Sequence, residues 1–234
     1  MTTNLEGHTL HSYDEELKHI HKLVVEMAEL VLEQTRQTLH GFSEQDFNIA
    51  NAVIEKEHDV DSYEVKVDEE IIATTARRSP VAKDLRIIMS LCKSVTDLER
   101  IGDEAAKISH LTKEIFDNER ADPSIHLLRD ISVMGNMSVN ILQEAVIALK
   151  ELNLEKATQI FKIHSELDKE FQSSVRRLST FILEDSRNVG HAVSIVLIIK
   201  ALERIGDHAK NIAEYIIYLV KGMDVRHTKN IATH

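Results

Sequence analysis

The chain has 234 residues, of which 43% are hydrophobic and 29% are charged, and its formal net charge is −11. This length allows one large domain or two domains of about 115 residues, and the negative charge disfavours binding to nucleic acid or anionic lipid except at a local basic patch. Because only 7 Gly and 2 Pro interrupt the chain, the composition predicts a few long helices.

Targeting and membrane signals are weak in this sequence. The first ten residues, MTTNLEGHTL, lack the basic and then apolar pattern of a signal peptide. The longest apolar run, from Ala192 to Ile199, is far shorter than the roughly 18 residues that a membrane helix needs. The single cysteine, Cys92, cannot form an internal disulfide. These features predict a soluble protein of the cytoplasm.

Three helices are expected in the first half, after a loose arm over residues 1–11. Apolar residues recur with a period near 3.6 over 12–41, 43–78 and 80–118. Gly41 suits a left-handed cap at the end of the first helix, and Ser43 suits the N-cap of the second. Pro80 is expected to be the first residue of the third helix, since proline is favoured there.

The second half repeats this plan. The polar stretch 118–124 (NERADPS) reads as a linker, and helices are expected from Pro123 to the turn at 152–154, from 155 to 185, and from the break at 186–190 to Gly222. The predicted organisation is therefore a first three-helix unit over 12–117, the linker over 118–124, a second unit over 125–222 and a tail over 223–234.

One hexapeptide, LERIGD, occurs at residues 98–103 and again at residues 202–207, 104 residues later. Each copy falls in the third helix of its half, which predicts an all-α fold of two similar three-helix bundles in tandem. Gly102 and Gly206 each cost about 1 kcal/mol relative to alanine inside a helix. Close approach of a neighbouring helix would explain both glycines.

Each hexapeptide carries two acids four residues apart, which places both carboxylates on one face of the helix. Helices joined by a short turn run antiparallel, so residues equally distant from the turn lie side by side. Counting at 1.5 Å per residue matches each acidic pair with a second pair on the preceding helix. The candidate metal ligands are Glu57, Asp61, Glu99 and Asp103 in the first half, and His164, Asp168, Glu203 and Asp207 in the second half.

Oxygen-rich sites of this kind suit Mg, Mn, Fe or Zn, as divalent or trivalent ions. The competing interpretation is an ordinary solvated surface, in which Arg100 and Arg204 neutralise the acids as salt bridges. His58 and His191 are interpreted as surface or packing residues rather than ligands. Cys92 lies on an apolar stripe and is interpreted as a core residue.

Three stretches together resemble the PhoU family of phosphate-uptake regulators. They are the duplicated LERIGD, the segment SPVAKDLR at residues 79–86, and the closing Val220–Gly222. The resemblance covers nearly the whole chain and implies six helices in two similar bundles. The family's E/D-x-x-x-D motifs bind metal clusters in some members, and they map onto the carboxylates named above. One departure is His164, which stands where the family motif has an acid, so the second site suits a softer or less highly charged ion.

The resemblance also implies a function. PhoU-like proteins are cytoplasmic, often dimeric and not enzymes, and they connect the ATPase of a phosphate ABC transporter with a sensor histidine kinase. They hold the phosphate-starvation response off and restrain uptake when phosphate is plentiful. The chain is thus expected to act without nucleic acid and to meet the membrane only through its partners.

Two alternatives remain open at this point. The first is an adaptor that binds the same protein partners without any metal. The second is a di-iron carboxylate enzyme, which would need two Glu-x-x-His pairs at one level of a four-helix bundle. The two such pairs, Glu16/His19 and Glu55/His58, differ by roughly 12 Å in height, which argues against one shared site.

Overall fold

The computed structural model describes residues 11–116, 125–184 and 189–226. These residues form seven α-helices and no strand: α1 (His11–Glu44), α2 (Phe47–Glu55), α3 (Glu57–Arg78), α4 (Lys83–Phe116), α5 (Ile125–Glu151), α6 (Leu154–Glu184) and α7 (Val189–Lys221).

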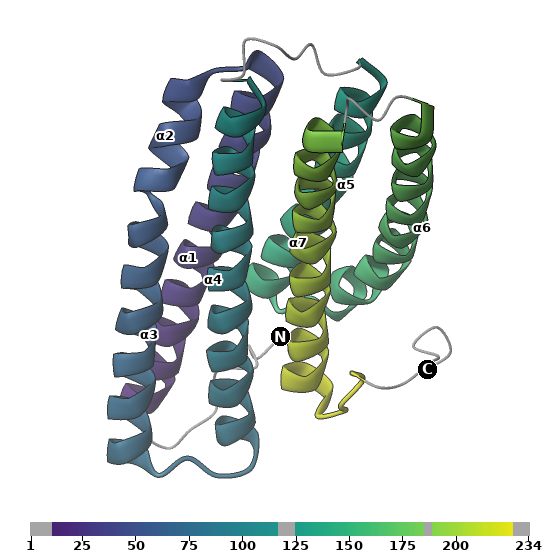
Figure 1. The fold of residues 1–234 in the computed structure, drawn as a ribbon. Coiled ribbons are helices and arrows are strands. Elements are labelled where there is room, and N and C mark those ends of the chain that lie inside the picture. The colour runs from purple at the N-terminus through teal and green to yellow at the C-terminus, as the bar shows by residue number, and fades with distance from the viewer. Residues whose placement is uncertain (1–10, 117–124, 185–188, 227–234) are drawn as a thin grey trace.

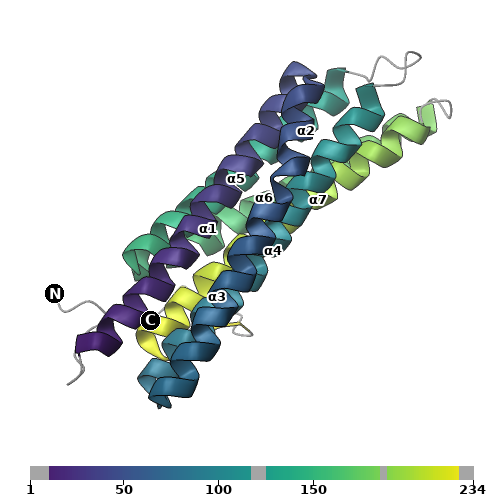
Figure 2. The ribbon, with the colours of Figure 1, turned by 90° about the vertical axis from the view of Figure 1, so that its left-hand side faces the viewer.

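The helices form two three-helix bundles that stand side by side. In the first bundle α1 and α4 pack against a rod made of α2 followed by α3, and in the second bundle α5, α6 and α7 pack together. The bundles meet where α4 packs on α7 and α1 packs on α5 (Figures 1 and 2). This arrangement confirms the predicted all-α fold of two similar bundles.

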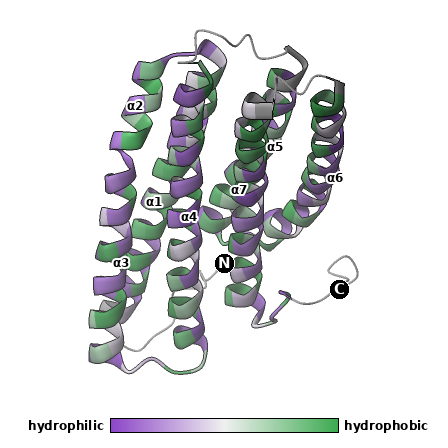
Figure 3. Ribbon diagram, viewed as in Figure 1, coloured by the Kyte–Doolittle hydropathy of each residue, from purple (hydrophilic) through white to green (hydrophobic). Residues whose placement is uncertain are grey.

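The helices are amphipathic, and their apolar stripes form one core that runs through both bundles. Hydrophilic and hydrophobic stretches alternate along each helix (Figure 3), as expected when one face is buried. Leu17 and Leu98 are fully buried in the first bundle, and Ile141 and Leu202 are fully buried in the second. Within the described residues, none of the helices is long and apolar enough to cross a bilayer.

The prediction of one continuous helix over residues 43–78 is wrong, because the structure has two helices there, α2 and α3. α1 continues through Gly41 to Glu44, and Gln45, with φ 55°, is the residue that adopts the left-handed conformation. The cap of α2 is Asp46 rather than Ser43, since its carboxylate accepts hydrogen bonds from two backbone N–H groups of the first turn. Lys56 then separates α2 from α3.

Pro80 does not begin the next helix. Ser79 and Ala82 both have φ 47°, so the chain turns over four residues and α4 begins at Lys83. The predicted turn at 152–154, between the fourth and fifth predicted helices (α5 and α6), is confirmed, because the Asn153 side chain accepts hydrogen bonds from the first backbone N–H groups of α6. Gly222, with φ +74°, ends α7 as predicted.

The predicted arm over 1–11, the linker over 118–124, the break at 186–190 and the tail over 223–234 fall wholly or partly outside the described residues. They therefore stay predictions.

A buried polar contact joins the two bundles. The carboxylate of Asp97 on α4 lies 2.6 Å from Nδ1 of His208 on α7, and Asn211 donates to the same carboxylate oxygen at 3.1 Å. Asp97 and His208 are both buried. Nearby, Arg204 of α7 forms a 2.8 Å ion pair with the buried Glu104 of α4. These contacts fix the position of α4 along α7.

The two hexapeptide glycines lie where a neighbouring helix comes close to the backbone. A Cβ atom on Gly102 would lie 3.3 Å from Val60 of α3, and a Cβ atom on Gly206 would lie 2.2 Å from Leu167 of α6. The predicted reason for both glycines is thus confirmed.

We expect Gly206→Ala to lower the free energy of unfolding by about 1 kcal/mol. Forcing the buried Leu167 to move costs about 1–3 kcal/mol, and better helix propensity offsets about 1 kcal/mol of this. Chemical denaturation measures the difference. The matched control is Gly190→Ala, because open space surrounds Gly190 and no loss is expected there. A Gly206→Ala protein as stable as the wild type would show that the close approach is not a constraint.

Candidate metal centres

The first acidic cluster lies between α3 and α4. Four acids follow one another at spacings of three or four residues on α3, so they share one face of that helix. Two acids of the first LERIGD copy lie opposite them on α4. We call this set the first cluster: Glu57, Asp61, Glu64 and Asp68 from α3, and Glu99 and Asp103 from α4.

Mutual repulsion is strong in the first cluster. Burial, followed by the charges of Asp103, Glu64 and Asp61, raises the pKa of Glu99 from 4.5 to about 7. Burial and the neighbouring carboxylates also raise the pKa values of Glu57 and Asp103, which share a hydrogen bond. The predicted facing of residues 57 and 61 toward residues 99 and 103 is therefore what the structure shows.

Neutralisation of these acids by arginine is not observed. Within the described residues, Arg100 forms no ion pair, and Arg204 pairs with Glu104 rather than with an acid of either cluster. A positive influence on the first cluster comes from His110 of α4, which opposes the rise in the pKa of Glu57. An anionic group of carboxylates without a lysine or arginine partner fits a cation chemically.

The second cluster lies at the equivalent place between α6 and α7. Nε2 of His164 is 2.8 Å from a carboxylate oxygen of Asp207, and Nδ1 of His164 is 3.4 Å from a carboxylate oxygen of Asp168. Among the described residues, these three form the only group of three or more His, Cys, Asp and Glu side chains with ligand atoms all within 4.8 Å of one another. One imidazole and two carboxylates fit a single borderline ion such as zinc or iron.

Glu203 does not join the other three predicted ligands of the second half. Its carboxylate is held by Lys200, one turn away on α7. The ammonium of Lys200 also lies 5.2 Å from the centre of the Phe171 ring. Burial alone would raise the pKa of Asp207, but the hydrogen bond from His164, with the charges of His164, Lys200 and Lys210, lowers it below 3.8.

The close approaches at the glycines align the two clusters residue by residue. Val60 contacts Gly102 in the same way as Leu167 contacts Gly206, so a residue of α3 corresponds to the residue 107 positions later in α6. Glu57 therefore corresponds to His164, and Asp61 corresponds to Asp168. Continuing the same offset, Glu64 corresponds to Phe171 and Asp68 to Val175. The first cluster therefore has three carboxylates that the second lacks, at Glu57, Glu64 and Asp68.

Sequence reasoning missed Glu64, Asp68 and Lys200. The signal for the two acids was present, because residues 57, 61, 64 and 68 continue a single helical stripe. Lys200 lies three residues before Glu203, a spacing that permits an ion pair but does not require one.

The di-iron alternative finds no support in the geometry of its first pair. Glu16 accepts two hydrogen bonds of 2.9 Å from the guanidinium of Arg78, at the end of the first bundle. Glu55 is exposed at the end of α2, next to the break at Lys56.

We expect Glu99→Gln to stabilise the metal-free protein above pH 7 and to have little effect below pH 4.5. Between pH 4.5 and about pH 7, the carboxyl group of Glu99 keeps its proton in the native state but loses it in the unfolded state. The free energy of unfolding of the wild type therefore falls as the pH rises through this range. Melting temperatures across this range, measured with a chelator present, give the comparison. Glu114→Gln, at an exposed position of α4, is the control and should show no such pH dependence. A parallel pH profile for Glu99→Gln and wild type would contradict the repulsion.

The family and its solved structures agree with this architecture. A family profile described as the PhoU domain matches residues 24–112 and 131–216, one match in each bundle. A crystal structure of PhoU from Pseudomonas aeruginosa superposes with a TM-score of 0.84 at 33% identity, covering 90% of this chain and 100% of that one. A phosphate transport system regulatory protein PhoU from Streptococcus pneumoniae gives 0.80 at 25% identity, covering 91% and 98%.

Curated relatives match over almost the same length. A phosphate-specific transport system accessory protein PhoU from Serratia marcescens is 35% identical over 224 residues, which cover 96% of this chain and 90% of the relative. The protein of the same name from Escherichia coli (strain K12) is 33% identical and covers 96% and 91%. The chain therefore belongs to the PhoU family.

Proposed function

We propose that this protein is a regulator of phosphate uptake and a negative regulator of the phosphate-starvation response. The observation that carries this proposal is the near full-length match to proteins named as accessory to the phosphate-specific transport system. We propose further that it acts in the cytoplasm without catalysis of its own, as a homodimer that connects the transporter ATPase with a sensor histidine kinase.

The helical architecture supports an adaptor role. The bundles present long helical faces that carry the two acidic clusters, and α4 and α7 are locked together by buried polar contacts. Such surfaces suit docking by complementary charge, which gives specificity and fast association.

In the strain that produces this protein, we expect deletion of its gene to release alkaline phosphatase expression in phosphate-rich medium. The regulator would then no longer hold the kinase in its inactive state. Restoring the wild-type gene should restore repression, and phosphatase activity measures both results. Phosphatase that stays repressed in the deletion strain would contradict the proposed function.

Metal binding is the second part of the proposal. In the first cluster, carboxylates whose pKa values are raised by burial and by neighbouring charges would hold one or more hard cations and be relieved of their repulsion. In the second cluster, His164, Asp168 and Asp207 would hold one ion. A bound ion would supply positive charge that ties α3 to α4 and α6 to α7.

Metal analysis of protein purified without chelator tests both sites. We expect Glu99→Ala/Asp103→Ala to lose the metal of the first cluster and His164→Ala to lose that of the second, because removing a ligand weakens binding by at least about tenfold to a hundredfold. Glu203→Ala is the matched control, since Lys200 already occupies this carboxylate and metal content should not change. Equal, near-zero metal in all these proteins would contradict the metal proposal.

A metal-independent adaptor is the alternative for the whole protein. The second bundle favours it, because His164 already contacts Asp207 and Lys200 already pairs with Glu203. The deletion strain separates the two mechanisms. If Glu99→Ala/Asp103→Ala and His164→Ala both restore full repression, regulation does not need the metal.

A further inference from the structure

One end of the molecule brings together the turn between α3 and α4 and the end of α7. Arg86 of α4 donates from Nε to the backbone oxygen of Leu219 at 3.3 Å, and its guanidinium lies 6.0 Å from the centre of the Tyr218 ring. Gly222 lies against the same guanidinium. We call the surface formed by residues 79–93 and 215–226 the basic end.

Large apolar side chains are exposed at the basic end. Val81 is 72% exposed and Met223 is 48% exposed, and both lie in segments outside the helices. Leu85 and Met89, one turn apart on α4, and Tyr218 on α7 are exposed as well. Exposed apolar side chains gathered in one place indicate an interaction surface.

The charge of this surface is opposite to that of the whole chain. Its two segments contain five basic residues (Lys83, Arg86, Lys93, Lys221 and Arg226) and two acids (Asp84 and Asp224), so 5 − 2 gives +3. Glu214, which lines the same hollow as Tyr215 and Tyr218, lowers this to +2, on a chain of net charge −11. Arg226 is paired with Asp224 at 2.9 Å. Lys83 and Lys221 are exposed. Each lies two residues in sequence from one of the two most exposed apolar side chains of this surface, Val81 and Met223.

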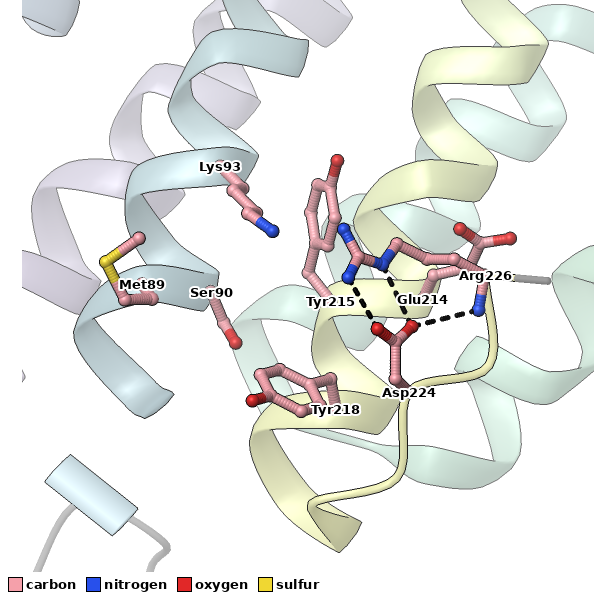
Figure 4. Close-up of a pocket in the computed structure, with 8 residues that line it drawn as sticks. All are labelled: Met89, Ser90, Lys93, Glu214, Tyr215, Tyr218, Asp224 and Arg226. Atoms are coloured by element: carbon pink, nitrogen blue, oxygen red, sulfur yellow. Dashed lines mark hydrogen bonds and ion pairs between the residues drawn. The ribbon is translucent and has the colours of Figure 1, made fainter. Parts of the chain in front are cut away.

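The hollow between α4 and α7 at the basic end is too small to be a binding groove for a helix. Ser90 and Lys93 of α4 point toward Tyr215 and Tyr218 of α7 (Figure 4), and the hollow that these residues line together with Met89 has a volume of about 20 Å³. This volume holds about one water molecule, so it does not take an incoming helix. Ser90 is buried, and its hydroxyl has no hydrogen-bond partner in the described structure, which agrees with a hydrated hollow.

We propose that the basic end docks directly on the surface of an anionic lipid bilayer. Val81 and Met223 enter the boundary between headgroups and acyl chains, Tyr218 lies at the headgroup level, and Lys83 and Lys221 meet lipid phosphates. The acidic clusters on α3 and α6 keep the rest of the molecule away from the negative membrane. This contact goes beyond the proposed function, in which partners alone bring the protein to the membrane.

Sedimentation with vesicles tests the proposal on the full chain. Wild type is expected to bind vesicles of phosphatidylcholine mixed with phosphatidylglycerol and not vesicles of phosphatidylcholine alone, and added salt should release it. Lys83→Glu/Lys221→Glu should weaken binding by at least roughly 25-fold, because each basic side chain near an anionic bilayer contributes about fivefold. Val81→Ser/Met223→Ser should weaken binding roughly tenfold.

Matched controls keep the result interpretable. Lys162→Glu/Lys169→Glu reverses two exposed lysines on α6, and Val193→Ser removes a residue that is 51% exposed at the other end of α7; both should bind like wild type. Circular dichroism would check that each variant is folded.

Three outcomes would overturn the proposal: no binding of the wild type to anionic vesicles, equal binding of the wild type to neutral vesicles, or equal losses of binding in the control variants. Because the assay contains neither transporter nor kinase, its failure would leave the proposed regulatory function standing.

Discussion

The close contact between a helical glycine and an apolar side chain of the preceding helix sets the geometry of both bundles. Gly102 lies against Val60, and Gly206 lies against Leu167. A slip of one helix by a turn would place a backbone against a side chain that does not fit, since packed interiors accept few alternative registers. The glycines are neighbours of Asp103 and Asp207 in sequence, so the contact that fixes the register also fixes the height of the carboxylates.

The same register produces two electrostatically different sites. In the first bundle the α3 stripe offers acids at all four positions, and burial, followed by the charges of Asp103, Glu64 and Asp61, raises the pKa of Glu99 to about 7. In the second bundle a histidine, an aromatic ring and a valine replace three of those acids, and Lys200 approaches both the ring and Glu203. The pKa of Asp207 consequently falls. The first cluster therefore carries the larger uncompensated negative charge, whereas the second is closer to electrostatic balance.

The sequence carried the features that depend on local periodicity. Apolar spacing located six rods, the repeated hexapeptide gave the tandem arrangement, and counting from the turns paired the acids of α3 with those of α4. It did not reveal the break at Lys56, because residues 43–78 keep one helical period across it and the capping carboxylate of Asp46 competes only locally. The ion pair between Lys200 and Glu203 could not be predicted either. A spacing of three residues allows several side-chain rotamers, and tertiary packing selects the one that forms the pair.

How the two halves meet was beyond sequence reasoning for a further reason. Asp97 and His208 are 111 residues apart, and neither belongs to a repeated pair, since the counterpart of Asp97 at the 104-residue offset is Ala201. Their contact follows only from the packing of α4 on α7. It is nonetheless costly to break, because removing one partner of a buried hydrogen bond leaves the other unsatisfied, at about 1–3 kcal/mol.

This buried contact lies next to the clusters along the chain. Asp97 precedes Glu99 by two residues on α4, and His208 directly follows Asp207 on α7. The two residues therefore share rigid helical turns with the carboxylates, while their own side chains point into the junction between the bundles. Any rotation of α7 that carried Asp207 away from His164 would also pull His208 away from Asp97. The electrostatic balance of the second cluster and the cohesion of the two bundles are for this reason properties of a single helical turn.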